Sequence, residues 1–105
     1  MRRLPVRYLL DAAADLDSIF DHLLDQGASP RIARAFVERI EVQCERIGGL
    51  PEGYPAHPDL GPGIRISPFE RSAVIAYRLA GDAVEIVNVF YGGRDYQSLL
   101  GDKPT

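Results

Sequence analysis

Four arginines in the second half of the chain are the residues best suited to chemistry or to recognition. Arg65, Arg71 and Arg78 lie on or beside segments rich in β-branched residues, and Arg94 follows two glycines. A guanidinium group binds carboxylate or phosphate oxygens through paired hydrogen bonds. A cluster of such groups could stabilise charge in phosphoryl transfer, hold the carboxylates of a partner, or form only solvent-exposed edges. The residue types alone leave these three roles open.

The segment FYGGRDYQSLL, residues 90–100, indicates how Arg94 would be placed. Gly92 and Gly93 permit a sharp turn out of the preceding strand. We expect the tail at 96–100 to fold back over the sheet edge as a short helix or turn, with Asp95 as its N-cap. The residues that we predict to border a partner-binding groove are Arg65, Arg71, Arg78, Tyr91, Arg94, Asp95 and Tyr96.

No arrangement of side chains predicts a catalytic, cofactor or metal site. The two histidines, His22 and His57, have no metal-ligand spacing with the single cysteine, Cys44, whereas a zinc site takes about four such ligands. Cys44 falls on an apolar helical stripe, so we expect it to be buried. Arg94 has no acid–base partner, and no nucleophile or phosphate-loop motif occurs. We therefore predict no catalytic residue, no cofactor and no metal.

The first half of the chain predicts a helical hairpin that would support these residues. Apolar residues recur with helical spacing over residues 11–26, with Asp11 as the N-cap and Gly27 as the end. Ser29 and Pro30 combine a capping hydroxyl with proline at the first helical position, which starts a second helix. A connection of about three residues makes the two helices antiparallel. The apolar stripes are Leu16, Ile19, Phe20, Leu23 and Leu24 in the first helix and Ile32, Phe36, Ile40, Cys44 and Ile47 in the second.

Strands are predicted on both sides of this hairpin. β-branched and aromatic residues favour strands at 4–10, 64–69, 72–79 and 84–91. The proline- and glycine-rich segment 49–63 is a loop, and Gly81-Asp82 suits a type II′ turn between the last two strands. These elements predict an α+β fold, in which an N-terminal strand precedes an antiparallel helical hairpin packed on one face of a twisted antiparallel sheet. Strands 72–79 and 84–91 would be adjacent and central.

The last strand indicates where a partner would bind. Strict alternation would place Val84, Ile86, Asn88 and Phe90 on one face and Glu85, Val87, Val89 and Tyr91 on the other. Both faces are largely apolar, as in a strand that is covered on both sides. The helical hairpin covers only one face, and a short tail could shield part of the second. Because an uncovered apolar face on a monomer usually marks a binding site, we predict that a partner docks there.

The size and charge of the chain limit the classes of function. With 105 residues, of which 46% are hydrophobic, the chain fits a single domain over residues 1–105. A net charge of −3 gives no general attraction to nucleic acid, so direct nucleic-acid binding is not expected. A single cysteine cannot form an intramolecular disulfide, which fits the cytoplasm. No apolar run near the start is long enough for a signal or membrane segment, so we predict a cytoplasmic protein with no membrane contact.

The order of these pieces resembles ParE-type toxins of the RelE/ParE superfamily over nearly the whole chain. The matching residues are Ala14-Asp15-Leu16, Ile19, Ala33, Phe36, Leu50-Pro51, Gly53, Gly63-Ile64-Arg65, Val74-Ile75, Tyr77, Val84, Ile86, the segment GGRD that ends at Asp95, and Leu99-Leu100. The resemblance implies the toxin of a type II toxin–antitoxin system. Such a toxin inhibits DNA gyrase by binding it, without catalytic chemistry, and a cognate ParD-like antitoxin wraps and neutralises it.

The RelE branch of the superfamily provides the main alternative, because it cuts messenger RNA in the ribosome with basic residues and a tyrosine. Ala73 stands where the resemblance places an arginine of those ribonucleases, and the 49–63 loop has no lysine. Arg94 matches a catalytic position, but Tyr96 is too near it to match the usual tyrosine. The prediction is therefore a ParE-like inhibitor. The alternatives are a ribosome-dependent endoribonuclease and a superfamily member that has lost toxicity and only binds its partner.

The net charge also bears on how an antitoxin would be recognised. This chain is acidic, whereas ParE toxins are often basic. Bulk charge therefore does not predict antitoxin binding, and the local arginines would have to receive acidic groups from the antitoxin.

Overall fold

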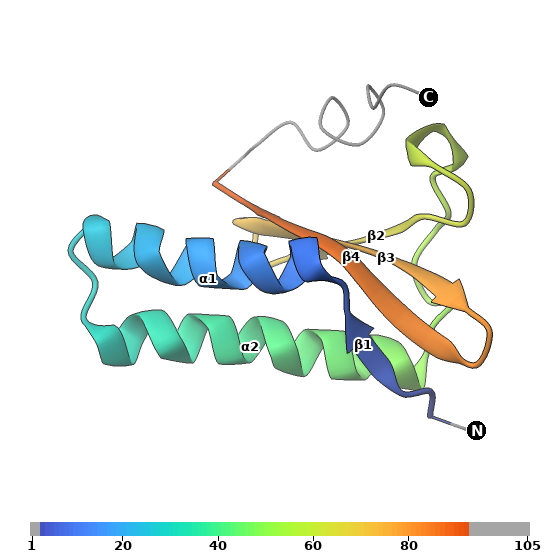
Figure 1. Cartoon of the computed structure of the whole chain (residues 1–105), viewed down its shortest axis with the longest axis horizontal. Helices are drawn as coiled ribbons and strands as arrows, with labels where there is room; N and C mark the ends of the chain where they lie inside the picture. Colours follow the sequence, from blue (N-terminus) through green and yellow to red (C-terminus); the bar gives the residue numbers. More distant parts are fainter. Residues whose placement is uncertain (1–2, 93–105) are drawn as a thin grey trace.

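The computed structural model describes residues 3–92, which form two layers (Figure 1). Two antiparallel helices, α1 (Leu10–Asp25) and α2 (Pro30–Gly49), pack on one face of a four-stranded sheet. The strands are β1 (Val6–Tyr8), β2 (Arg65–Phe69), β3 (Ala73–Ala80) and β4 (Ala83–Tyr91), in the order β1-β4-β3-β2. The predicted α+β class is confirmed, and β3 and β4 are adjacent and central.

The first strand makes the sheet mixed rather than purely antiparallel. β1 pairs in parallel with β4, with Val6 opposite Val84 and Tyr8 opposite Ile86, whereas the β2–β3 and β3–β4 pairs are antiparallel. Parallel neighbours need a long connection, and the helical hairpin provides part of it. β1 is only three residues long, so it covers only the first part of the β4 edge.

The helix ends follow local signals with one exception. The Ser29 hydroxyl accepts a hydrogen bond from the Ile32 N–H at 3.2 Å, and Pro30 opens α2, as predicted. Gly27 follows α1 with φ +97°, which confirms it as the end of that helix. The prediction of Asp11 as N-cap is wrong, because the helix begins at Leu10 and Leu9 is the N-cap. Asp11 lies instead in the first turn, where a carboxylate stabilises the positive end of the helix dipole.

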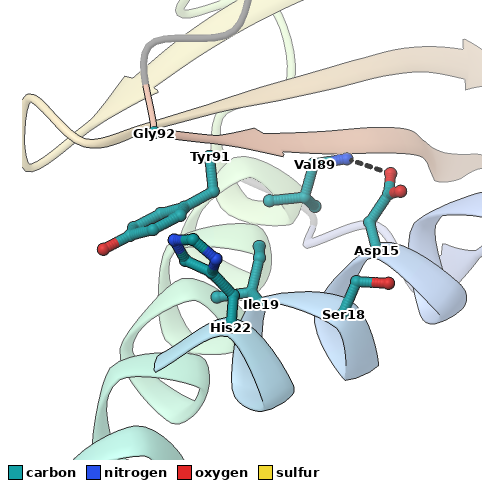
Figure 2. A pocket seen from close by; sticks show the side chains of 7 residues that line it. All are labelled: Asp15, Ser18, Ile19, His22, Val89, Tyr91 and Gly92. Carbon is teal, nitrogen blue, oxygen red and sulfur yellow. Dashed lines mark hydrogen bonds between the residues drawn. The ribbon is translucent and has the colours of Figure 1, made fainter. Parts of the chain in front are cut away.

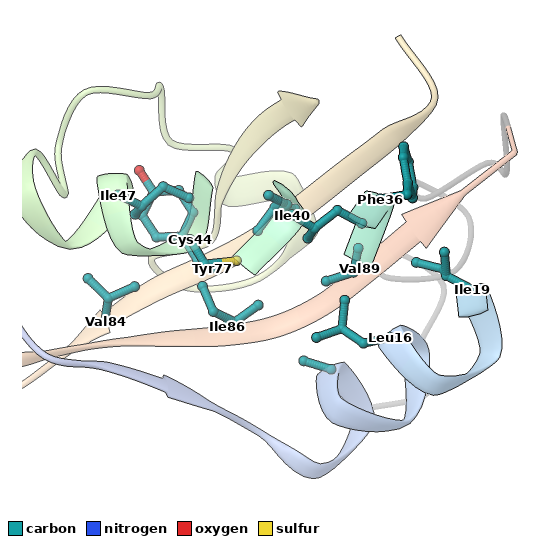
Figure 3. Packing of buried hydrophobic residues seen from close by; sticks show 12 residues of the cluster. Leu16, Ile19, Phe36, Ile40, Cys44, Ile47, Tyr77, Val84, Ile86 and Val89 are labelled. Atoms are coloured by element: carbon teal, nitrogen blue, oxygen red, sulfur yellow. The ribbon is translucent and has the colours of Figure 1, made fainter. Parts of the chain in front are cut away.

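The main core lies between the helices and the sheet (Figure 3). Cys44 is fully buried, as predicted, and burial raises the pKa of its thiol to about 12. The prediction that Ile32 belongs to the buried apolar stripe of α2 is wrong, because this residue is 62% exposed. Ala33 is the buried residue in the first turn of α2. This turn extends beyond the end of the sheet (Figure 1). The cluster includes Leu16 and Ile19 from α1, Phe36, Ile40, Cys44 and Ile47 from α2, and Ile75, Tyr77, Val84, Ile86 and Val89 from the sheet.

A β-bulge in β4 overturns the predicted alternation of its side chains. Ala76 pairs with Asn88 but Tyr77 pairs with Ile86, so Val87 has no partner on β3. The extra residue reverses the alternation at this point. As a result, Val84, Ile86, Val89 and Tyr91 all pack on the helix side, whereas Val87 and Phe90 pack on the other side. Neither of the two predicted sets of β4 residues therefore lies on one face.

The 49–63 loop covers part of the sheet face that the helices leave open. Leu60, which ends a short 3₁₀ helix (Pro58–Leu60), and Ile64 pack against Ile66, Ala76 and Phe90. The face that was predicted to be uncovered therefore carries a second small core.

The turn between β3 and β4 agrees with the predicted type II′ turn. Its two central residues join Ala80 to Ala83, and Gly81 has φ +64°.

Candidate functional site

Arg65 is engaged inside the molecule rather than presented on a free surface. It lies on β2, and its Nη1 donates a short hydrogen bond to the carbonyl of Tyr54 in the 49–63 loop. A bridge between Ala56 and Arg65 holds the same loop beside the strand. Nearby, the Tyr77 hydroxyl donates to the Pro51 carbonyl at 2.8 Å. The geometry gives Arg65 a role in anchoring this loop to the sheet.

Arg78 lies on the sheet face away from the helices and already has a partner. Its Nε donates to Glu85 Oε1 at 2.9 Å across the β3–β4 pair. Arg7 on β1 is the other neighbour of Glu85 in the register, so two arginines flank one glutamate in this row. Sequence reasoning missed Arg7, because only the parallel pairing of β1 with β4 brings it there.

Arg71 is exposed at the tip of the β2–β3 hairpin. Glu70 and Arg71 are the two central residues of the turn, and both have left-handed backbones, with φ +49° and +62°. The Ser72 N–H donates to the Phe69 carbonyl at 3.1 Å, which closes the turn. Arg39 of α2 donates two hydrogen bonds to Glu70, at 2.8 and 3.0 Å, and these lower the pKa of the Glu70 carboxyl. Glycine and asparagine normally occupy such turns.

Replacing Arg71 with glycine is expected to raise the free energy of unfolding by about 0.5 to 1 kcal/mol. A left-handed backbone costs an L-residue about 1 to 2 kcal/mol, and the added chain entropy of glycine offsets part of this gain. Urea denaturation followed by circular dichroism measures the difference. Arg71→Ala is the matched control, because it removes the same charge and keeps the strain. Equal stabilities of the two variants would show that the backbone at Arg71 is not strained.

Tyr91 lines a groove between α1 and the end of β4, which we call the α1–β4 groove (Figure 2). The cavity has a volume of about 420 Å³. Ile19 and Val89, both buried, form apolar parts of its wall, and the exposed Ser18 and His22 lie on α1. The lining residues are Asp15, Ser18, Ile19, His22, Val89, Tyr91 and Gly92.

An aromatic row fixes the Tyr91 ring at one end of this groove. The ring lies edge-to-face against His22, with 5.6 Å between centroids, and against Phe36 of α2, with 5.5 Å. Phe36 in turn contacts Phe69 of β2 at 5.9 Å. Tyr91 is therefore held from both helices, so its half-exposed side is presented in a defined orientation.

Asp15 joins α1 to the bulged part of β4. Its Oδ2 accepts hydrogen bonds from the Val89 N–H at 2.8 Å and from Asn88 Nδ2 at 3.1 Å (Figure 2 shows the first). Among residues 3–92, the buried Asn88 Oδ1 has no hydrogen-bond partner. Asp15 was part of the family resemblance, but no pattern in the sequence predicted that it would pair with β4. Its position becomes apparent only from the packing of α1 along this strand.

Substitution of Asp15 by alanine is expected to lower the free energy of unfolding by about 1 to 2 kcal/mol. The Val89 N–H and the Asn88 amide would lose a charged acceptor, and an unsatisfied buried donor costs about this much. The measurement is again urea denaturation. Asp21→Ala, at an exposed position of the same helix, is the control and should change stability by less than about 0.5 kcal/mol. Equal effects of the two substitutions would contradict the role assigned to Asp15.

The structure places the predicted binding residues in two separate regions. Tyr91 and Arg71 lie at one end of the sheet, since Tyr91 pairs with Ala73. Arg65 and Arg78 lie towards the other end, since Arg65 pairs with Tyr77. Seven residues of extended chain separate Arg71 from Arg78, which is about 23 Å. Arg94, Asp95 and Tyr96, together with the predicted tail at 96–100, lie outside the described residues.

Metal binding and membrane insertion find no support in the part of the chain that is described. Within residues 3–92, no three His, Cys, Asp or Glu side chains come together in a way that could hold a metal ion. None of the helices in that range combines the length and the apolar character needed to cross a membrane.

Comparison with known proteins gives one family and two informative structures. The family model described as "ParE toxin of type II toxin-antitoxin system, parDE" matches residues 6–96. A chain of the chromosomal ParDE system from P. aeruginosa superposes with a TM-score of 0.74 and 25% identity, covering 86% of this chain and 97% of that one. A chain of the toxin–antitoxin complex RelBE2 from Mycobacterium tuberculosis gives a TM-score of 0.59 and 21% identity, covering 90% and 97%. No curated protein matches the sequence.

Proposed function

Because this chain belongs to the ParE toxin family of type II toxin–antitoxin systems, we propose that it binds and inhibits DNA gyrase in the cytoplasm. We further propose that a ParD-like antitoxin, encoded beside it, neutralises it by binding. The observation that carries this proposal is the family match over residues 6–96. The likeness in fold to a chain of the P. aeruginosa ParDE system supports it.

The environment of Ala73 supports inhibition by binding rather than RNA cleavage. This is the position where the resemblance places an arginine of the RelE-type ribonucleases. Ala73 is only 4% exposed at the start of β3, and its register partners are Phe69 and Tyr91. A buried alanine between two aromatic neighbours supplies no proton donor and no charge to a phosphate. We therefore propose no catalytic residue in this chain.

Two assays on the purified protein separate the candidate functions. We expect inhibition of gyrase-catalysed DNA supercoiling and no cleavage of messenger RNA in a translation-coupled assay. Cleavage of messenger RNA with unchanged supercoiling would establish the ribonuclease instead. A protein that is inactive in both assays but binds the antitoxin would be a superfamily member that has lost toxicity.

A further inference from the structure

We propose that the α1–β4 groove binds an extended segment of the antitoxin that carries basic and apolar side chains. This inference rests on the proposed neutralisation by an antitoxin and adds the place and the chemistry of the contact. Three features of the described residues support it: an open strand edge, an apolar groove wall, and a helix whose negative charges have no counter-ions.

The strand edge is open because β1 ends early. The pairing of β1 with β4 stops at Ile86, where the Leu9 N–H donates to the Ile86 carbonyl. Beyond that point, no strand within residues 3–92 lies on this side of β4. The Val89 N–H points away from β3, because it donates to Asp15. By antiparallel alternation, the Val89 carbonyl and the backbone groups of Tyr91 point the same way. Because Asp15 already accepts from the Val89 N–H, an extended peptide can pair with this edge through the Val89 carbonyl and the Tyr91 backbone groups.

The groove wall is apolar where it meets the sheet. Ile19 and Val89 line it but are only 4% and 2% exposed, so the half-buried Tyr91 ring is the more accessible apolar part of this wall. A cavity of about 420 Å³ is within the size range of pockets that hold ligand groups. Strand pairing fixes the backbone of a bound peptide, and alternate side chains then enter the pocket. The occupant therefore needs an apolar side chain at the position that faces Tyr91.

The charge of α1 determines the sign of the flanking side chains. The helix carries five aspartates and no lysine or arginine. Neither of the two ion pairs within residues 3–92 involves an α1 residue. By helical spacing, Asp11 and Asp25 extend the stripe of Asp15, Ser18 and His22 along the groove. This negative stripe attracts lysine or arginine. The aspartates of α1 are Asp11, Asp15, Asp17, Asp21 and Asp25.

The arginines of the sheet are less suited to receive the antitoxin. Arg65 already donates to the Tyr54 carbonyl, and Arg78 already pairs with Glu85. An acidic antitoxin segment would have to compete with these internal acceptors. A basic segment in the α1–β4 groove meets carboxylates that lack a cationic partner among the described residues.

Photo-crosslinking locates the antitoxin directly. The probe is the protein encoded by the reading frame adjacent to this gene, and p-benzoylphenylalanine replaces Ser18 in the groove. Val74, on the opposite sheet face, and Val42, 51% exposed on α2, are the comparison positions. We expect crosslinking at Ser18, to a segment that contains lysine or arginine beside apolar residues. Crosslinking at Val74 or Val42 without any at Ser18, or a crosslinked segment that is acidic, would overturn the proposal.

Two matched double variants test the role of charge. Asp11→Asn with Asp25→Asn removes two charges on the groove side, and Asp17→Asn with Asp21→Asn removes two on the side that faces α2. The groove-side pair should weaken antitoxin affinity about tenfold at low ionic strength, and the other pair should change it less than about threefold. Equal effects of the two pairs would contradict the proposal. A wild-type protein that fails to bind this antitoxin would instead contradict the proposed function.

Discussion

Truncation of Phe36 to alanine is expected to lower the free energy of unfolding by about 3 to 5 kcal/mol. Phe36 is only 9% exposed, and its ring contacts Tyr91 and Phe69 edge-to-face. The Arg39 guanidinium lies 5.2 Å from the ring centroid on its face. Loss of the ring would leave a cavity where α2 meets β2 and β4. Since a domain of this size has a total stability of about 5 to 15 kcal/mol, the substitution should remove between about one fifth and all of it.

Urea denaturation of wild-type and variant proteins measures this effect. Val42→Ala is the control, because Val42 is on the same helix and is 51% exposed. Its stability should stay within about 0.5 kcal/mol of the wild type. A Phe36→Ala protein with a wild-type unfolding midpoint would mean that Phe36 does not face the sheet and that the register of α2 is wrong.

Replacing Gly48 with alanine should lower the free energy of unfolding by about 3 kcal/mol, near the upper end for overpacking. A Cβ atom at this position would lie 2.6 Å from the Leu4 carbonyl oxygen and 3.0 Å from Val6 Cγ2. The nearer neighbour is backbone, which cannot rotate away, and the Leu4 N–H also donates to the Gly48 carbonyl at 2.9 Å. The added methyl group would therefore force β1 away from α2.

The neighbouring glycine provides the control for Gly48. A Cβ atom on Gly49 would lie 3.4 Å from Arg3 Nη2, the end of a flexible side chain. Gly49→Ala should therefore leave stability unchanged or raise it by up to about 1 kcal/mol, because alanine favours the helix. Thermal unfolding of the two variants, measured under the same conditions, compares their stabilities. Equal stabilities would show that β1 does not pack closely against the end of α2.

Most secondary structure could be predicted from the sequence because its signals are local. Ser29 and Pro30 start α2 through contacts within one turn, and the turn at Gly81 depends on the backbone freedom of one residue. The core of α2 followed from its apolar spacing, apart from Ile32. The prediction for Ile32 was wrong because the apolar stripe of α2 continues beyond the point where the sheet ends. Helical periodicity shows which face is apolar, but it does not show how far the covering layer extends.

The candidate site was much less predictable, because its geometry depends on tertiary pairing. The bulge at Val87 reverses the side-chain alternation of β4, and no local pattern in the strand sequence marks the extra residue. The parallel pairing of β1 brings Arg7 beside Glu85, and the packing of α1 along β4 brings Asp15 to the Val89 N–H. These contacts join residues far apart in the chain. A single sequence identifies the residue types but does not establish these contacts.

We propose that this protein inhibits gyrase and that an antitoxin relieves the inhibition. The most direct test is a titration of the purified protein into a DNA gyrase supercoiling reaction, with and without the antitoxin encoded beside its gene. We expect supercoiled product to disappear as the protein reaches the concentration of gyrase, and to return when the antitoxin is added in equal amount. Full supercoiling in the presence of excess protein, without antitoxin, would contradict the claim.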